Sequence, residues 1–376
     1  MVIRACLGLN ALSVVVLLQL GGCASFEYYL QSVRGHFEVI GKRQSIESVL
    51  ANPDTDAATR ARLRLVQRLR QFASDSLRLP NNRSYQTYAD IGRDFVVWNV
   101  FATPELSLEP IDWCFPVVGC LDYRGYFSRS AAERFAQALR SQGNDVYVGG
   151  VTAYSTLGWF DDPVLNTMLR WGESQLASVL LHELAHQRVY VADDTAFNEA
   201  FATAVAREGL RRWLAEPRDQ AQAKEALFEQ MRNDSFVRLA EATRQALHLL
   251  FESNLSDDEK RTGKAEAFSL LRVNYREFKS AWDGYGGYDE WMQELNNAKL
   301  QSIATYYDDV AGFEGLLRLV NGDLEAFYNA AQAIAKLRVG ARHACLDALV
   351  SITGKPGSQP VRSPPVCKVA ISFAEM

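Results

Sequence analysis

The stretch Leu181-His182-Glu183-Leu184-Ala185-His186-Gln187 holds two histidines four positions apart, with a glutamate directly after the first. Apolar residues recur every three or four positions from Trp171 to Gln187, which predicts a helix with one buried face. Residues four apart lie one above the other on a helix, so the two imidazoles can converge on one point. This H-E-x-x-H spacing is typical of a zinc site in which His182 and His186 bind the metal and Glu183 takes a proton from the attacking water.

A tetrahedral catalytic zinc site needs a third protein ligand, and Glu199 is the candidate. It lies in a second run of helical spacing, which Asp193, Asp194 or Thr195 could cap. A turn of seven or eight residues between the two helices lets them pack antiparallel, with Glu199 facing the histidines. The alternative is a histidine pair buried as an ordinary core feature. Two of the five histidines of the chain fall in this one pentapeptide, which disfavours that alternative.

The two motifs carry a family resemblance. His182-Glu183-x-x-His186 followed by Asn198-Glu199-Ala200-Phe201-Ala202 resembles the gluzincin metallopeptidases and, more narrowly, the bacterial lipoprotein family of predicted zinc aminopeptidases. The further matching stretches are Trp113-Cys114-Phe115-Pro116-Val117-Val118-Gly119-Cys120, Tyr123-Arg124-Gly125-Tyr126-Phe127, Ala153-Tyr154-Ser155-Thr156-Leu157-Gly158-Trp159-Phe160 and Leu295-Asn296-Asn297-Ala298. The resemblance implies a zincin-like fold, one zinc ion and peptide substrates.

One position departs from the family pattern. In many gluzincins an acidic residue four positions after the glutamate ligand supports a zinc histidine, whereas this chain has Thr203. A partner of this kind fixes the ring orientation of a metal-binding histidine. Asp193 or Asp194 is the expected substitute.

The patterns on either side of the motif differ. Residues 84–127 are rich in aromatic and β-branched residues broken by prolines, which indicates short strands and turns, whereas the chain beyond Gly209 has apolar stripes of helical period. One of the helices predicted there runs from Tyr288 to Ala304. We therefore predict an α+β fold, mainly α: a zincin-like metallopeptidase core with an H-E-x-x-H helix, a small β region upstream and a helical C-terminal part. Residues 24–376 form one predicted domain, with metal motifs at 182–199 and a helical region at 210–352.

The N-terminus predicts export and a lipid anchor. Residues 1–22 have a short positive start and an apolar run, which is the pattern of a signal peptide. Leu20-Gly21-Gly22-Cys23 resembles a bacterial lipobox, so cleavage before Cys23 and lipidation of Cys23 are expected, with Ala24 favouring the outer membrane. The alternative is an ordinary cysteine behind a signal peptide. We predict a lipid-anchored protein in the cell envelope of a Gram-negative bacterium, facing the periplasm.

The remaining cysteines fit an oxidising compartment. Four cysteines follow Cys23, an even number that can form two disulfides: Cys114, Cys120, Cys345 and Cys367. We prefer the pairs 114–120 and 345–367 because each pair is close in sequence. The other two connectivities stay open. A zinc site of four cysteines is disfavoured, since the chain has no C-x-x-C.

Composition excludes some partner classes. The chain has 376 residues, of which 48% are hydrophobic and 23% charged, as in an ordinary globular protein. Its net charge of −5 provides no basic footprint, which argues against a nucleic-acid partner.

Other site residues are predicted less directly. The strand-like run Tyr147–Trp159 is the candidate wall for an extended substrate. A group that donates to the developing oxyanion is expected downstream, with Tyr306 preferred over Tyr307, Tyr288 and His248. The acidic candidates for binding a free α-amine are Asp161, Asp162, Glu173 and Asp193.

These observations favour a zinc-dependent peptidase, and the family resemblance favours an aminopeptidase. An envelope endopeptidase is the first alternative. The second is a non-catalytic envelope lipoprotein that binds zinc. A structural zinc site normally closes all four positions with protein ligands, and no fourth Cys or His lies near this motif in the sequence, so the second alternative is disfavoured.

Overall fold

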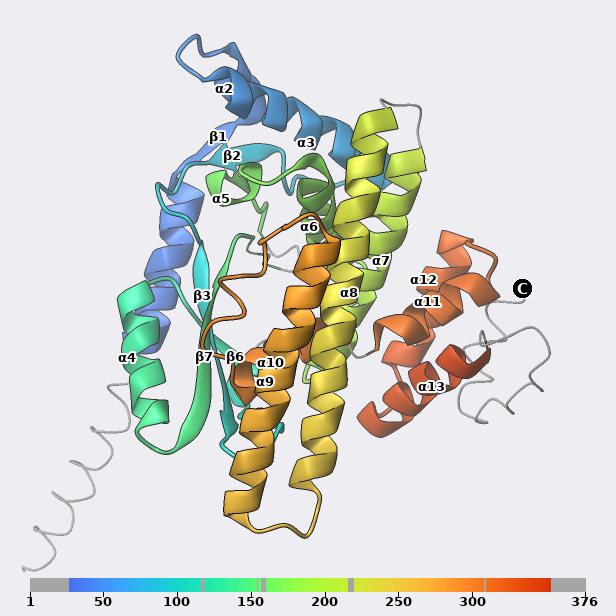
Figure 1. Cartoon of the computed structure of the whole chain (residues 1–376). Coiled ribbons are helices and arrows are strands. Elements are labelled where there is room, and N and C mark those ends of the chain that lie inside the picture. The colour runs from blue at the N-terminus through green and yellow to red at the C-terminus, as the bar shows by residue number, and fades with distance from the viewer. Residues whose placement is uncertain are drawn as a thin grey trace, which may run out of the picture.

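A computed structural model describes residues 27–115, 119–153, 155–156, 160–215, 220–307 and 309–352. Within these residues the chain is mainly helical with small sheets, so the predicted α+β class is confirmed (Figure 1). A helix at 27–41 comes first. The later helices are α2 (Ile46–Ala51), α3 (Ala57–Asp75), α4 (Arg129–Arg140), α5 (Asn166–Leu169), α6 (Glu173–His186), α7 (Thr195–Ala215), α8 (Gln220–Phe251), α9 (Asp257–Ala281), α10 (Asn297–Tyr307), α11 (Val310–Leu319), α12 (Leu324–Ala335) and α13 (Val339–Ile352). Among these described helices, none is both long and apolar enough to cross a membrane.

The strands lie in the N-terminal half of the chain. They are β1 (Arg43–Ser45), β2 (Thr87–Ala89), β3 (Val97–Pro104), β4 (Trp113–Phe115), β5 (Gly119–Leu121), β6 (Tyr123–Tyr126), β7 (Asn144–Val151) and β8 (Val164–Leu165). The sheet orders are β1-β2-β8, β6-β3-β7 and β4-β5. Strand β3 is antiparallel to both of its neighbours, whereas β2 and β8 are parallel.

The two faces of the β6-β3-β7 sheet have different surroundings. On one face Val100, Ala102 and Val146 form an apolar cluster with α4, which covers this side of the sheet (Figure 1). Successive strand residues point to opposite faces, so Val97 and Asn99 lie on the other face of β3. That second face borders a large cavity among the described residues.

Helices α6 and α7 pack side by side in the main hydrophobic core. Leu180 and Leu184 of α6 and Phe201 of α7 are fully buried, and burial of each such side chain contributes about 1.5–3 kcal/mol. Gly209 of α7 permits the close approach, because a Cβ there would lie 2.7 Å from a methyl group of Leu181. The helix predicted at 171–187 is thus confirmed. It begins two residues later and ends one residue earlier than expected.

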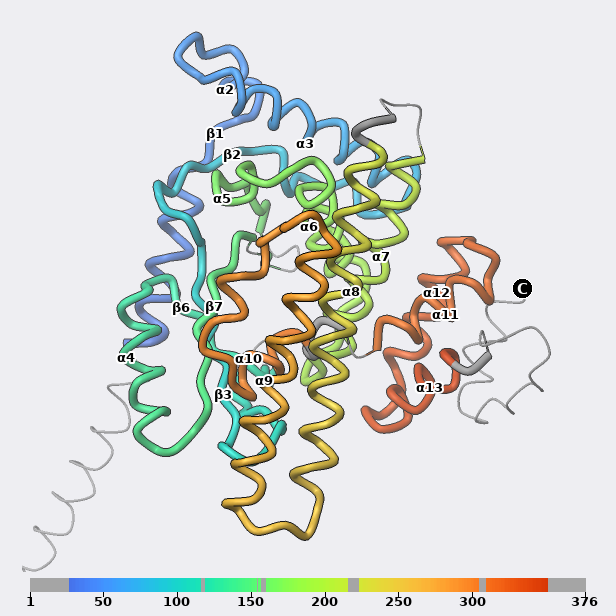
Figure 2. Tube along the Cα trace, in the orientation of Figure 1, coloured from blue at the N-terminus to red at the C-terminus, as the bar shows by residue number. Residues whose placement is uncertain are grey.

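Helices α8 and α9 form a long hairpin with an apolar cluster of its own. Figure 2 shows the two helices running side by side, with the turn between them at one end of the molecule. Phe236, Leu247 and Leu271 belong to this cluster. Ser256 begins α9 with a reciprocal capping box, in which its side chain and that of Glu259 satisfy each other's backbone N–H groups.

The predicted helix from Tyr288 to Ala304 is wrong in its first half. Residues 285–296 form turns, a bend and irregular backbone, and the helix begins only at Asn297. Asp289 binds the side chains of Tyr275 and Lys279, and Glu294 has a positive φ of 48°. These contacts and the left-handed residue hold the segment in turns despite its apolar spacing.

Candidate metal centre

The loop from Gln187 to Asp194 joins the two helices that carry the motif. Its backbone is tied to the first turns of α7 by Asn198. The Asn198 carboxamide accepts a hydrogen bond from the N–H of Val191 at 2.8 Å and donates one to the Val191 carbonyl at 2.6 Å. This pair of bonds fixes the path of the loop, so Glu199, the next residue, returns to the end of α6.

The side chains of His182, His186 and Glu199 converge. The two Nε2 atoms lie 3.1 Å apart, and Nε2 of His182 is 3.0 Å from the nearer carboxylate oxygen of Glu199. Nε2 of His186 is 3.7 Å from the other oxygen. All three ligand atoms lie within 4.8 Å of one another, so this group could hold a metal ion. Two imidazole nitrogens and one carboxylate form a donor set that suits zinc.

Burial and charge act against each other at this group. Burial disfavours the charge of Glu199, but the two imidazoles outweigh it and lower the pKa of that carboxyl below its usual range. Burial likewise opposes a proton on His186, but the Glu199 carboxylate raises the pKa of that imidazole. Burial raises the pKa of Glu183. Within the described residues, Nδ1 of His186 has no hydrogen-bond partner.

The three residues and Glu183 line a cavity of about 890 Å³. Helices α6, α7 and α8 border it on one side, and the second face of the β6-β3-β7 sheet borders it on the other. Tyr123 of β6 and Tyr190 of the loop also line it, and burial together with the charge of Glu199 raises the pKa of both phenols. Neither tyrosine was expected from the sequence, because both precede Glu199, whereas the oxyanion donor is predicted downstream of it.

Asp194 does not support a zinc histidine, so that prediction is wrong. Its carboxylate caps α7 by accepting the Phe197 N–H at 3.0 Å, and it forms a buried ion pair with Arg342. It also lies 3.3 Å from Nε2 of His343, whose Nδ1 is 2.6 Å from Asp309. Asp194 therefore ties the start of α7 to α13.

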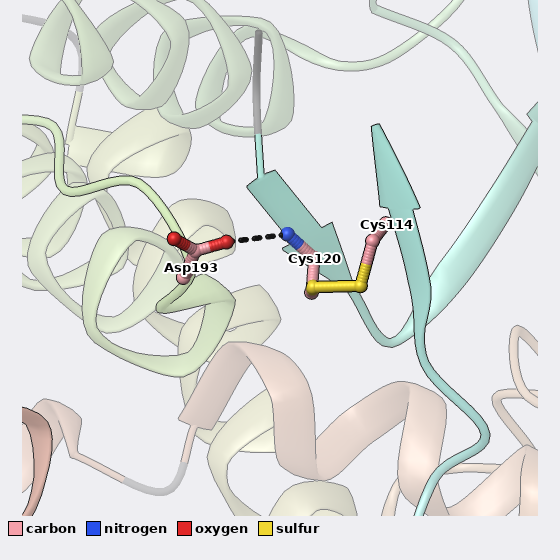
Figure 3. The surroundings of a disulfide bond; sticks show 3 residues. All are labelled: Cys114, Cys120 and Asp193. Carbon is pink, nitrogen blue, oxygen red and sulfur yellow. Dashed lines mark hydrogen bonds between the residues drawn. A yellow bond between two sulfur atoms is a disulfide. The ribbon is translucent and has the colours of Figure 1, made fainter. Parts of the chain in front are cut away.

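Asp193 is also engaged elsewhere. Cys114 and Cys120 form the predicted disulfide across the β4-β5 hairpin, and the Cys120 N–H donates to the Asp193 carboxylate at 2.8 Å (Figure 3). A Cβ at Gly119 would lie 2.3 Å from the same carboxylate, so the hairpin fits closely against the loop. Cys345 is also disulfide-bonded. Cys367, the partner predicted for it from the sequence, lies outside the described residues.

The acidic candidates for amine binding do not line the cavity. Asp161 pairs with Arg83, Asp162 binds Thr156, and Glu173 accepts from Trp213. Two acidic residues of α8 line the cavity instead: Glu229, and Asp234, which pairs with Arg207 of α7 at 2.8 Å. No sequence pattern singles out these two residues, because α8 carries other acidic residues as well.

The predicted substrate wall and oxyanion donors have mixed outcomes. Val151, Thr152, Ala153 and Ser155 of the run 147–159 line the cavity, whereas Tyr147 does not. Among the expected donors, Tyr288 lines the cavity and His248 does not. Tyr154, residues 157–159 and the side chains of Tyr306 and Tyr307 lie outside what the structure describes.

Comparison with known proteins gives one match. A family model described as "Putative aminopeptidase" matches residues 27–346, which include the β6-β3-β7 sheet, both motif helices and the α8–α9 hairpin. No curated protein and no solved structure gives a significant match. Because the match extends over most of the sequence and contains the convergent His182, His186 and Glu199, the chain belongs to this aminopeptidase family.

Proposed function

We propose that the protein is a zinc-dependent aminopeptidase. The observation that carries the proposal is the convergence of His182, His186 and Glu199 at the wall of a cavity large enough for a short peptide. Family membership supports peptide substrates. The donor set of two imidazoles and a carboxylate supports zinc as the ion.

Each motif residue has a distinct role in this proposal. His182, His186 and Glu199 hold the metal, which when bound would polarise the scissile carbonyl and acidify the attacking water. Glu183 lines the cavity beside them and takes the proton of that water. The same carboxyl then delivers the proton to the departing amine. Tyr123 and Tyr190 present phenol groups near Glu199, where either can donate to the developing oxyanion.

Glu229 is the proposed group for the free α-amine. An aminopeptidase needs a negative charge at a fixed place in its cavity to bind a protonated amine. Glu183 and Glu199 are committed to catalysis and metal binding, and Asp234 is paired with Arg207. Glu229 is the remaining carboxylate among the described residues that line the cavity.

The decisive experiment presents a peptide mixture, free and N-acetylated, to the full chain purified in mild detergent. Mass spectrometry should show loss of single N-terminal residues, which acetylation blocks. Glu183→Gln should keep its zinc and lose hydrolysis by about 10²-fold or more. Glu173→Gln is the matched control on the same helix, since Glu173 does not line the cavity, and it should stay active. Internal cuts in both peptide sets would instead establish an endopeptidase.

Metal analysis tests the ligand assignment separately. Glu199→Ala should lower the zinc content measured by plasma mass spectrometry, whereas Glu183→Gln should not. Full zinc occupancy in Glu199→Ala would remove Glu199 from the ligand set. No hydrolysis by a zinc-loaded wild-type protein would favour a non-catalytic zinc-binding lipoprotein.

We also propose that Cys23 is lipidated and anchors the protein to the envelope membrane. The support is the lipobox-like sequence alone, because residues 1–26 lie outside the described structure. Metabolic labelling with a fatty acid should mark the wild-type protein and leave Cys23→Ala unlabelled. Labelling of Cys23→Ala would contradict the assignment.

A further inference from the structure

Asn99 occupies an unusual place on the sheet. It lies in the middle of β3, the central strand, and pairs with Gly125 of β6 and Gly149 of β7. Its side chain is on the face opposite α4 and lines the cavity, although the residue is only 6% exposed. No hydrogen-bond partner for its carboxamide is found among the residues that the structure describes. No atom of this carboxamide is among the fully buried ones that lack a partner, so it is open to the cavity, where a ligand can form hydrogen bonds with it.

Gly125 leaves the Asn99 carboxamide open to the cavity. Its backbone does not require glycine, because it is not among the residues with positive φ. What glycine supplies here is space. A Cβ at Gly125 would lie 3.3 Å from Oδ1 of Asn99 and 3.1 Å from a methyl group of Val97. Any side chain at this position would crowd the one polar group that β3 directs into the cavity.

The surroundings of Asn99 indicate the chemistry of its ligand. The neighbouring wall residues Val97 and Val151 are apolar, so a fully charged group bound there would be poorly solvated. A carboxamide has both a donor and an acceptor, which matches the N–H and C=O of a peptide group. Tyr123 lies on the same strand and face as Gly125. Burial and the nearby charge of Glu199 raise the pKa of the Tyr123 phenol, so Tyr123 lies between the group of His182, His186 and Glu199 and this part of the wall.

We infer that the Asn99 side chain binds a main-chain amide of the peptide substrate, an inference that rests on the proposed function. Asn99 is thus a positioning residue: it holds a peptide group that neighbours the scissile bond, and the open space over Gly125 receives the substrate backbone. Because it recognises the main chain, it contributes affinity without selecting a side chain.

The test measures peptide binding apart from hydrolysis. The full chain carrying Glu183→Gln is loaded with zinc and titrated calorimetrically with tetra-alanine amide and with analogues in which one N–H at a time is replaced by an ester oxygen. At one position the replacement should weaken binding about tenfold in this background. In the Asn99→Ala double variant the same replacement should change binding less than twofold, because the partner of that N–H is gone.

Two further variants keep the test informative if Asn99→Ala folds poorly. Gly125→Ala should weaken binding of the parent peptide and remove its sensitivity to the ester, since the added methyl crowds Oδ1 of Asn99. Thr103→Val is the matched control. Thr103 is on the same strand and has a buried hydroxyl without a partner among the described residues, but it does not line the cavity, so binding should be unchanged.

The outcomes separate this inference from the proposed function. Ester sensitivity that is the same with and without Asn99 overturns the inference, whatever the wild-type activity. Asn99-dependent binding in a wild-type protein that cleaves no peptide supports the inference and overturns the peptidase proposal. If none of these peptides binds, both the inference and the proposed function are overturned.

Discussion

Asp193 and Asp194 are neighbours in the loop before α7, yet they tie it to two very different regions. Asp193 is exposed and accepts one backbone hydrogen bond from the disulfide hairpin β4-β5. Asp194 is 6% exposed and meets Arg342 and His343 of the C-terminal helices, while it caps α7. One anchor is a surface contact, and the other is a buried ionic cluster.

The difference bears on how Glu199 is held. Glu199 lies one turn into α7, so its position depends on where that helix begins. The buried charge of Asp194 cannot move without leaving Arg342 unpaired, whereas water can replace the hydrogen bond of Asp193. The contacts of Asp194 therefore fix the start of α7. The β4-β5 hairpin, which Asp193 contacts, mainly completes the cavity wall, since Phe115 and Leu121 line the cavity.

The largest expected effect is that of Asp194→Asn. The amide can still cap α7, but Arg342 is left buried without its counter-charge, so unfolding by denaturant should show a loss of about 3 kcal/mol. Asp56→Asn is the matched control, because Asp56 caps α3 from an exposed position and asparagine caps equally well. If the two variants lose the same stability, the ionic cluster is not the stronger anchor.

The next effect comes from opening the hairpin. In the double variant Cys114→Ser, Cys120→Ser the short loop closed by the disulfide is released, and the loss of stability should be roughly 2 kcal/mol. Thermal unfolding of the oxidised wild type and the variant measures it. A loss larger than that of Asp194→Asn would reverse the ranking of the two regions.

Asp193→Ala should cost about 1 kcal/mol, from one lost hydrogen bond and from a methyl side chain at a positive φ of 63°. Asp193→Asn should cost less, because asparagine keeps an acceptor and tolerates the left-handed region. Denaturant unfolding of the pair checks this. Equal losses would show that the hydrogen-bond acceptor at this position carries no stability.

The remaining effect is a pH dependence. Hydrogen bonds to Asp194 and Asp309 raise the pKa of His343 to about 10, above its ordinary value of about 6.5. A raised folded pKa means that His343 contributes stability fully below pH 6.5 and loses it as pH rises through 10. The stability difference between wild type and His343→Gln should therefore shrink from pH 6.5 to pH 10. A difference that stays constant over this interval would contradict the charged state of His343.

The convergence of the two histidines and Glu199 was predictable because the sequence pattern that indicates it is short and local. His182, His186 and Glu199 fall within two adjacent helices, and helical spacing alone places the two histidines on one face. The partners of the loop were not predictable in the same way. Asp194 meets Arg342 across 148 positions of sequence, and Asp193 meets Cys120 across 73. No spacing rule connects residues so far apart.

The sheet wall shows the same limit. The aromatic and β-branched run at 84–127 predicted strands, but which side of β3 faces the cavity depends on its register against β6 and β7. In the sequence, Asn99 is simply one polar residue within a predicted strand. Only the packing of α4 on the opposite face shows that its side chain is directed into the cavity.

The cavity wall is assembled from residues 28 to 288, whereas the metal group is contained within residues 182–199. The residues that could hold a metal ion are thus confined to one short segment, whereas the cavity wall draws on most of the fold. For protein engineering this separation is useful, because the shape and polarity of the cavity can be redesigned from β3, β6 and α8. None of those changes touches His182, His186 or Glu199.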